Sequence, residues 1–462
     1  MGDRRRVDRV ITIAEAMASS PGNTIPNMFG HTYDVKAAYN LFGRSEATPD
    51  NLQAGHRELV KDQMHQTGEY LLIEDRSEFS WSGNNPVEGL GPIGDGSAGL
   101  QGFLLHTVLV AKWDGATEEG SWDKRPPLEI VGLADQRYSV RRTLADGQLP
   151  SNKEQSKKRQ WRKRESEVWA ESVKRLGKPP EGSRWIVVAD READIYEMLL
   201  ECQKQGWDYV IRACQDRCLE MESGSGGSRQ RLFEVARGVE SLGQCEVYLR
   251  AREGRATRTA QLNIGRCKVR IQSPQRPDHG PGFYPAIECT VVRVWEEPKD
   301  GSEGLEWILL CSGSVEGFEQ AREKMQQYAS RWLIEELHKG IKTGLGAERL
   351  QLESAERLYA AISIMSVVAL RLLELKERMR FNPEAKAEQA GMTEMELKIL
   401  KAVSRKPLKT VRDVALVIGR LGGHMNRARD GMPGWLTLWR GMNRLGNMME
   451  GAIIARNLHQ FG

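Results

Sequence analysis

The chain has 462 residues, of which 40% are hydrophobic and 28% are charged, and its formal net charge is +4. This length exceeds what one ordinary core accommodates, so a soluble globular protein of two or three domains is expected. The slight positive excess permits a polyanionic partner without requiring one, and the most apolar run, 360–370, is too short to span a membrane.

The first 65 residues carry the apolar periodicity of helices. Helices are predicted at 8–18, 34–42 and 48–64, and the text S-S-P-G-N at 19–23 ends the first of them. Four arginines crowd the start of the first helix: Arg4, Arg5, Arg6 and Arg9. Such a cluster commonly contacts phosphate. The alternative is a small helical cap on the next domain.

The period then changes to that of strands. A short apolar run at 70–75 ends in acids and is followed by alternation through Trp81, and further strands are predicted at 104–113 and 128–140. Three strands in succession indicate an antiparallel meander. A continuous apolar run, 185–190, is typical of a strand buried on both faces.

Two stretches are strongly basic. Residues 153–164 carry seven cationic side chains and only one acid, with Trp161 among them, and lead into a predicted helix. Further on, Arg266, Lys268 and Arg270 alternate with apolar residues, which predicts a half-buried strand with a cationic outer face. The strand is either a DNA contact or a solvated sheet face.

A long helical pattern begins near Glu316 and contains no proline before residue 342. Within it, five polar side chains at spacings of three or four fall on one narrow sector: Tyr328, Arg331, Glu335, Lys339 and Lys342. The cations would keep the single carboxylate ionised and could bind phosphate oxygens. The alternative is a solvated face held by i,i+4 ion pairs.

Two predicted strands end in an aspartate, Asp75 and Asp190. If these strands are neighbours, their carboxylates meet at one sheet edge, and a helix packed across that edge can supply Glu335. Converging carboxylates repel one another without a counter-charge. A pair of hard divalent ions about 4 Å apart, which clamps a phosphodiester, is the usual resolution.

The remainder of the chain is predicted to be helical. A broadly apolar helix at 360–375 must be buried, a capping box opens another helix at Thr393, and a third ends at Gly422. Trp435, Leu438, Trp439, Met442 and Leu445 recur at helical spacing, as core or as interface. The seven cysteines include no C-x-x-C pair, which favours reduced core residues over disulfides or a metal site.

These motifs resemble those of DDE transposases with a ribonuclease-H-like core, in the Y-R-E-K branch of the insertion-sequence-four family that includes the transposon-five transposase. The resemblance runs from about Gly2 to the C-terminus. It rests on L-L-I-E-D ending at Asp75, V-V-A-D-R-E-A-D-I-Y around Asp190, L-E-W-I-L-L around Trp307, and Y-x-x-R-x-x-x-E-x-x-x-x-x-x-K over 328–342.

The resemblance implies roles for individual residues. Asp75, Asp190 and Glu335 would be catalytic and hold Mg²⁺, with Mn²⁺ as a substitute. Trp307 would stack on a base flipped out of the duplex end; the alternative is a core residue of a strand. Further DNA contacts are expected from Tyr328, Arg331, Lys339, Lys342 and Arg212. Arg76 stands where the family favours threonine, and either binds substrate or caps the strand.

The resemblance also implies an α/β fold, with a ribonuclease-H-like mixed sheet and an inserted β-subdomain between two helical domains. The expected divisions are a DNA-binding domain at 1–65, a catalytic core at 66–345 with its insertion at about 214–313, and a dimerisation domain at 346–462. The family normally has further residues before G-D-R-R-R, so the first domain is expected to be truncated.

The implied function is cut-and-paste transposition, with metal-dependent cleavage of transposon ends, a hairpin intermediate and strand transfer into target DNA. The partners would be double-stranded DNA of both kinds and a second copy of the chain in a synaptic complex, in the bacterial cytoplasm and on the nucleoid. One alternative is a truncated inhibitor that binds DNA or forms dimers. The other is a structure-selective nuclease of the same fold.

Overall fold

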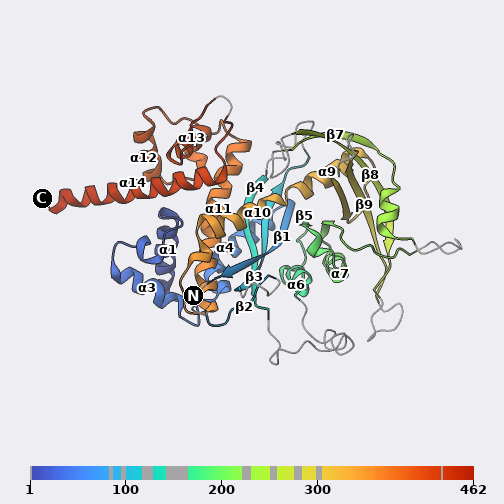
Figure 1. Ribbon diagram of the computed structural model, residues 1–462, viewed down its shortest axis with the longest axis horizontal. Coiled ribbons are helices and arrows are strands. Elements are labelled where there is room, and N and C mark those ends of the chain that lie inside the picture. Colours follow the sequence, from blue (N-terminus) through green and yellow to red (C-terminus); the bar gives the residue numbers. More distant parts are fainter. Residues whose placement is uncertain are drawn as a thin grey trace.

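A computed structural model of the protein describes residues 3–82, 87–94, 100–116, 128–141, 165–220, 230–249, 258–274, 284–297, 304–427 and 430–461. One large mixed sheet runs through the molecule, with helices on both of its faces (Figure 1). The N-terminal helices lie beside the C-terminal ones, at the end of the molecule opposite strands β7 to β9 (Figure 1).

The N-terminal segment folds as the apolar periodicity predicts. Its helices are α1 (Arg4–Ser19), α2 (Ile25–Met28), α3 (Thr32–Phe42) and α4 (Pro49–Met64). The side chain of Asp3 accepts a hydrogen bond from the backbone N–H of Arg5 at the start of α1, and Thr48 caps α4 in the same way. The proline at the first position of α4 needs no helical donor.

Five strands form the core of the sheet in the order β4-β3-β1-β5-β6. They are β1 (Gly68–Trp81), β3 (Gln101–Trp113), β4 (Leu128–Ser139), β5 (Ser183–Ala189) and β6 (Asp208–Arg212). The first three in chain order pair antiparallel, as the predicted meander requires, and β5 and β6 are parallel to β1 and to each other. The predicted ribonuclease-H-like mixed sheet is confirmed.

The predicted insertion does not form a separate sheet. It contributes β7 (Gly243–Leu249), β8 (Arg258–Ile271), β9 (Ile287–Glu296) and β10 (Glu306–Cys311), which extend the core sheet beyond β6 in the order β10-β9-β8-β7. The short strand β2 (Gly91–Pro92) pairs with β3 at the other side. Backbone hydrogen bonds therefore join the core and the insertion in one continuous sheet.

Helices cover the two faces of this sheet. On one face, here called the α7 face, lie α6 (Glu167–Leu176), α7 (Tyr196–Gln205) and α8 (Leu232–Arg237). On the other, the α11 face, lie α9 (Phe318–Ala329), α10 (Trp332–Lys339) and α11 (Ala355–Phe381). Along β1, Leu71 and Ile73 pack on the α11 face and Leu72 on the α7 face, as strand alternation requires.

Helix α11 is longer than the apolar run predicted. Its length and composition would suffice to cross a membrane, with a mean hydropathy of 1.8 over an 18-residue window, but 72% of that window is buried inside the protein. It contacts β4, α4, α1 and α13, so it is a central helix around which the other helices pack.

The remaining helices are α12 (Glu394–Ser404), α13 (Val411–Leu421) and α14 (Trp435–Phe461), and the capping box predicted at Thr393 is present. The apolar stripe that begins at Trp435 packs inside the chain. Trp435 lies against Gly340 and Trp439 against Gly344, where an added Cβ would approach each indole to within 3 Å. These side chains therefore belong to the core, not to an exposed interface.

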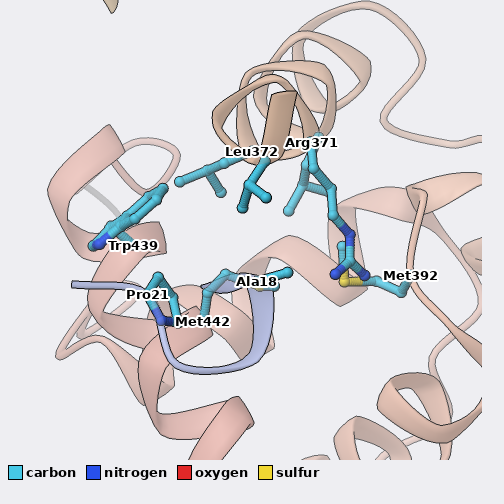
Figure 2. Close-up of a pocket in the computed structure, with 9 residues that line it drawn as sticks. Ala18, Pro21, Arg371, Leu372, Met392, Trp439 and Met442 are labelled. Atoms are coloured by element: carbon cyan, nitrogen blue, oxygen red, sulfur yellow. The ribbon is translucent and has the colours of Figure 1, made fainter. Parts of the chain in front are cut away.

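The end of α1 and the first half of α14 meet α11 at a small pocket (Figure 2). Ala18, Leu372, Trp439 and Met442 are among its lining residues. Nearby, the Ser20 hydroxyl donates to Glu450 at 3.0 Å. The N-terminal helices are thus packed against the C-terminal ones in this structure.

Candidate active site

Asp75 lies in the middle of β1, not at its end as the sequence predicted. The strand continues to Trp81 because the residues after Asp75 keep their pairing with β3, in which Asp75 lies opposite Thr107. The neighbouring strand β5, however, stops at Ala189, so β1 loses its parallel partner at this point. The carboxylate therefore lies where the sheet opens on one side.

The sheet register brings two further site residues beside Asp75. Glu74 pairs with Ala189 and Ala189 with Ile211, so the next residues in this register are Asp75, Asp190 and Arg212. Adjacent strands are about 4.8 Å apart. By strand alternation all three side chains point to the α11 face.

The predicted long helix is two helices. Helix α9 ends at Ala329 and α10 begins at Trp332, with a tight turn between them in which the N–H groups of Arg331 and Leu333 bond to carbonyls three residues back. Both turn residues keep right-handed φ and ψ angles, so the chain continues in nearly the same direction. The turn places Arg331 at the sheet opening.

Tyr328 and Arg331 contact Asp190, and Arg331 also pairs with Glu335. The Tyr328 hydroxyl donates to Asp190 Oδ1 at 3.1 Å, and Arg331 Nη2 lies 3.7 Å from Asp190 Oδ2 while it also donates to Glu335. Because one nitrogen contacts both carboxylates, their oxygens lie less than twice 3.7 Å apart. Burial and the charge of Asp190 raise the pKa of Tyr328 to about 12, so its hydroxyl stays protonated as a donor.

Asp75 has a partner that sequence reasoning missed. The side chain of His338 is buried, and its Nδ1 lies 3.7 Å from Asp75 Oδ2. Burial acts to raise the pKa of Asp75, but His338, the charge of Arg331 and a backbone N–H outweigh it and lower the pKa. In the sequence, the only signal for His338 is its position one helical turn after Glu335.

The two lysines of the motif lie further from the carboxylates. Lys342 is in a π turn, Gly340–Gly344, with its Nζ 5.0 Å from the centre of the Phe79 ring, and burial lowers its pKa. Lys339 is exposed at the end of α10. The described contacts tie neither lysine to Asp190 or Glu335, while Lys342 lies close enough to Asp75 for that charge to act on its pKa.

Trp307 and Arg212 line the side of the site toward the extended sheet. The Trp307 ring meets the Tyr328 ring edge to face, with centroids 5.0 Å apart, and its side chain is half-buried. Arg212 Nη2 donates to the carbonyl of Glu306 at 3.1 Å and lies close enough to Tyr328 to affect its pKa. Trp307 and Arg212 thus both lie beside Tyr328.

Arg76 points away from this group. Its side chain pairs with Glu192 at 2.9 Å and with Glu165 at 3.3 Å. Arg76 alternates with Asp75 along β1, which sends its side chain toward the α7 face. Its contacts are therefore ion pairs between elements and not contacts with the motif residues.

The donor set fits a hard divalent cation, because carboxylate oxygens are its preferred ligands. Among the residues that the structure describes, however, no three acidic, histidine or cysteine side chains are close enough to form a ready-made metal site. Arg331 lies between Asp190 and Glu335 and supplies the positive charge there. A cation bound between these two carboxylates would compete with this guanidinium.

The two predicted basic stretches are residues 153–164 and the cationic face of β8. Residues 153–164 lie outside the described part of the chain. In β8, Arg266 follows the register row of Arg212 through Leu309 and Val292, on the α11 face. Its neighbours on that face have acidic partners: Lys268 lies 4.0 Å from Glu316 and Arg270 lies 2.9 Å from Glu220.

Comparison with known proteins identifies two regions of the chain. Residues 1–47 match the family described as Transposase DNA-binding, and residues 165–371 match the family described as Transposase DDE domain. The second match includes Asp190 and the whole stretch from Tyr328 to Lys342, and Asp75 lies before it.

A cryo-EM structure of a piggyBac transposase synaptic complex with hairpin DNA is similar over 92% of this chain and 73% of that chain, at 10% identity and a TM-score of 0.35. A likeness of this degree supports no inference about the reaction.

Proposed function

We propose that the chain is a DDE transposase, an enzyme that depends on a divalent metal ion, and that it moves DNA by a cut-and-paste reaction through hairpin ends. The family matches over residues 1–47 and 165–371 support this proposal. The observation that carries the proposal is that Tyr328 and Arg331 contact Asp190, beside Asp75 in the same register row, while Arg331 also pairs with Glu335. A phosphodiester placed over this row would meet carboxylates on one side and cations on the other.

Asp75, Asp190 and Glu335 would hold Mg²⁺, with Mn²⁺ as a substitute. When bound, a metal pair supplies an activated water and stabilises both the attacking and the leaving oxygen. Arg331 then binds a phosphate oxygen, because cations at the carboxylates compete for its present partners. Tyr328, protonated in this site, donates to the DNA backbone.

The reaction would proceed through nicking, hairpin closure, hairpin opening and strand transfer. Water attacks the phosphodiester at the element end, and the 3′-oxygen leaves as a hydroxyl. This 3′-hydroxyl attacks the phosphodiester of the opposite strand, which joins the two strands of the element end as a hairpin. The bond to the flanking nucleotide breaks, and the flanking DNA leaves with a 3′-hydroxyl. A second water opens the hairpin, and the regenerated 3′-hydroxyl attacks a target phosphodiester. Trp307, half-buried beside Tyr328, would receive a base unstacked by the hairpin.

We further propose that the chain belongs to the insertion-sequence-four family and is similar to the transposon-five transposase. This proposal rests on the Y-R-E-K spacing. The partners would be transposon ends, target DNA and a second copy of the chain, in the bacterial cytoplasm. For dimerisation, the half of α14 beyond the core stripe exposes Met448, Ile453 and Ile454. We also propose that the chain divides into an N-terminal domain at 1–65, a catalytic core at 66–345 and a C-terminal domain at 346–462.

Two other functions are distinguished by the same assay. A truncated inhibitor would bind element ends without cutting them. A structure-selective nuclease would cut branched DNA without joining it. The three carboxylates and the half-buried Trp307 favour the transposase over both.

The test uses duplexes that carry the terminal repeats flanking the coding sequence, incubated with Mg²⁺ or Mn²⁺ and resolved on denaturing gels. We expect nicked strands, then hairpins, then joined products. Asp75→Ala, Asp190→Ala and Glu335→Ala should each abolish all three, while Glu394→Gln, an exposed acid in α12, should keep them. Double-strand breaks without any hairpin would refute the proposed route.

A further inference from the structure

A chain of buried polar side chains runs from α4 across the sheet to Asp75. Gln53, Gln136, Thr107 and His338 are each at most 4% exposed. They come from α4, β4, β3 and α10 in that order, and Thr107 lies opposite Asp75 on one side and opposite Gln136 on the other. Burying a polar group costs free energy unless the group is hydrogen-bonded, so each of these side chains is expected to have a partner.

Each group contacts the next. Arg57 Nη2 donates to Gln53 Oε1 at 2.7 Å, and Gln53 Nε2 donates to Gln136 Oε1 at 2.7 Å. Gln136 Nε2 donates to Thr107 Oγ1 at 3.1 Å, and Thr107 Oγ1 lies 3.2 Å from His338 Nε2. His338 Nδ1 completes the chain at 3.7 Å from Asp75 Oδ2.

The chemistry of the first members sets the direction of the whole chain. A guanidinium has donors only, so the Gln53 oxygen must face Arg57. The Gln53 nitrogen then faces Gln136, and it also donates to the carbonyl of Ser363 at 2.8 Å, which only accepts. Gln136 in turn presents its nitrogen to Thr107. The three bonds from Arg57 to Thr107 thus all donate toward the Asp75 end of the chain.

This direction favours one tautomer of His338. Thr107 Oγ1 already accepts from Gln136, so its hydroxyl proton is available to His338 Nε2. A ring whose Nε2 accepts carries its proton on Nδ1, and Nδ1 is the atom that faces Asp75. In this tautomer an N–H faces one oxygen of the Asp75 carboxylate across 3.7 Å.

We propose that His338 is a positioning residue for Asp75, which holds one carboxylate oxygen so that the other is directed at the bound metal ion. The proposal rests on the proposed function, because it takes Asp75 to be a metal ligand. Thr107 would act one step further out, by keeping the His338 proton on Nδ1. Partners that orient a metal ligand in this way change metal affinity about 10-fold to 100-fold when they are removed.

A matched pair of substitutions separates the two ends of the imidazole. In His338→Asn the amide nitrogen stands near the place of Nδ1 and keeps a donor for Asp75. In His338→Gln the amide stands near the place of Nε2, keeps the contact with Thr107 and loses that donor. Both variants are polar amides at a buried position, so differences in stability between them should be small.

The measurement is Mn²⁺ binding to the full chain without DNA, by the loss of the free-ion resonance signal, with thermal melting as the control for folding. We expect His338→Gln to weaken Mn²⁺ binding about 10-fold or more and His338→Asn to weaken it less than about threefold. Strand cleavage should follow, with a raised Mg²⁺ requirement and a nearly unchanged maximal rate. Equal Mn²⁺ affinity in the two folded variants would overturn the proposal.

The outer step is tested by Thr107→Val, which removes the hydroxyl and keeps the shape, and by Thr107→Ser, which restores the hydroxyl. Weaker Mn²⁺ binding in the first and recovery in the second would support the chain. Wild-type affinity in a folded Thr107→Val would overturn the part assigned to Thr107. Asp75→Asn separates this inference from the function: undiminished Mn²⁺ binding there would refute Asp75 as a ligand, and the role of His338 with it.

Discussion

Replacing Trp307 by alanine should separate hairpin formation from first-strand cleavage. The indole is half-buried at the start of β10, and its ring contacts Tyr328, which donates to Asp190. Nicking requires the carboxylates and a water. Hairpin closure requires, in addition, that the duplex end bend and that an unstacked base be accommodated.

The expected losses in hairpin rate and in stability follow from what the Trp307 ring contacts. Loss of a base-stacking partner costs about 1 to 3 kcal/mol, which is about fivefold to more than a hundredfold in rate. Loss of the edge-to-face contact with Tyr328 costs about 0.5 to 1.5 kcal/mol of stability. A fully buried tryptophan such as Trp169 would instead cost about 3 to 5 kcal/mol of stability when truncated.

The assay follows nicks and hairpins on end-labelled duplexes, with the melting temperature of each variant. We expect Trp307→Ala to fold, to nick within about threefold of the wild type, and to accumulate nicked ends. Trp81→Ala, which removes a half-buried tryptophan at the far end of β1, is the matched control and should change neither step selectively. Parallel loss of nicking and hairpins, with a lowered melting temperature, would return Trp307 to a structural role.

Two further predictions concern charge. Replacing Arg266 and Arg270 by alanine should weaken DNA binding alike for all sequences and reduce the salt slope by about one unit per lost phosphate contact, and an unchanged slope would assign this face of β8 to solvent. Burial and the charge of Arg57 lower the pKa of His56 to about 4, and its Nε2 accepts a bond from the N–H of Leu133. The unfolded chain therefore binds more protons below about pH 6.5, and up to about 3 kcal/mol of stability should be lost between pH 6.5 and 4. His56→Gln should flatten this dependence in urea titrations, and an equal slope in both proteins would contradict it.

Local pattern alone determined the type of most elements in this protein. Periods of 3.6 and 2 follow from which side chains must be buried, so α1, α3, α4, β3, β4 and β5 were predictable within a few residues. Capping chemistry is equally local, which is why the start of α12 at Thr393 was predictable. The spacing from Tyr328 to Glu335 likewise predicted one shared face. In the structure Tyr328 and Arg331 both contact Asp190, and Arg331 also pairs with Glu335.

Three features were decided only by tertiary structure, because each depends on partners distant in the chain. Asp75 lies within β1 and not at its end, since pairing with β3 continues where β5 stops. The Trp435 stripe is core because Gly340 and Gly344 leave room for its rings. The orientation of His338 depends on Thr107 and Gln136, residues more than 200 positions away that no local period connects to it. Sequence spacing determines which side chains share one face of a helix or strand. Only the packed structure determines which distant residues that face contacts.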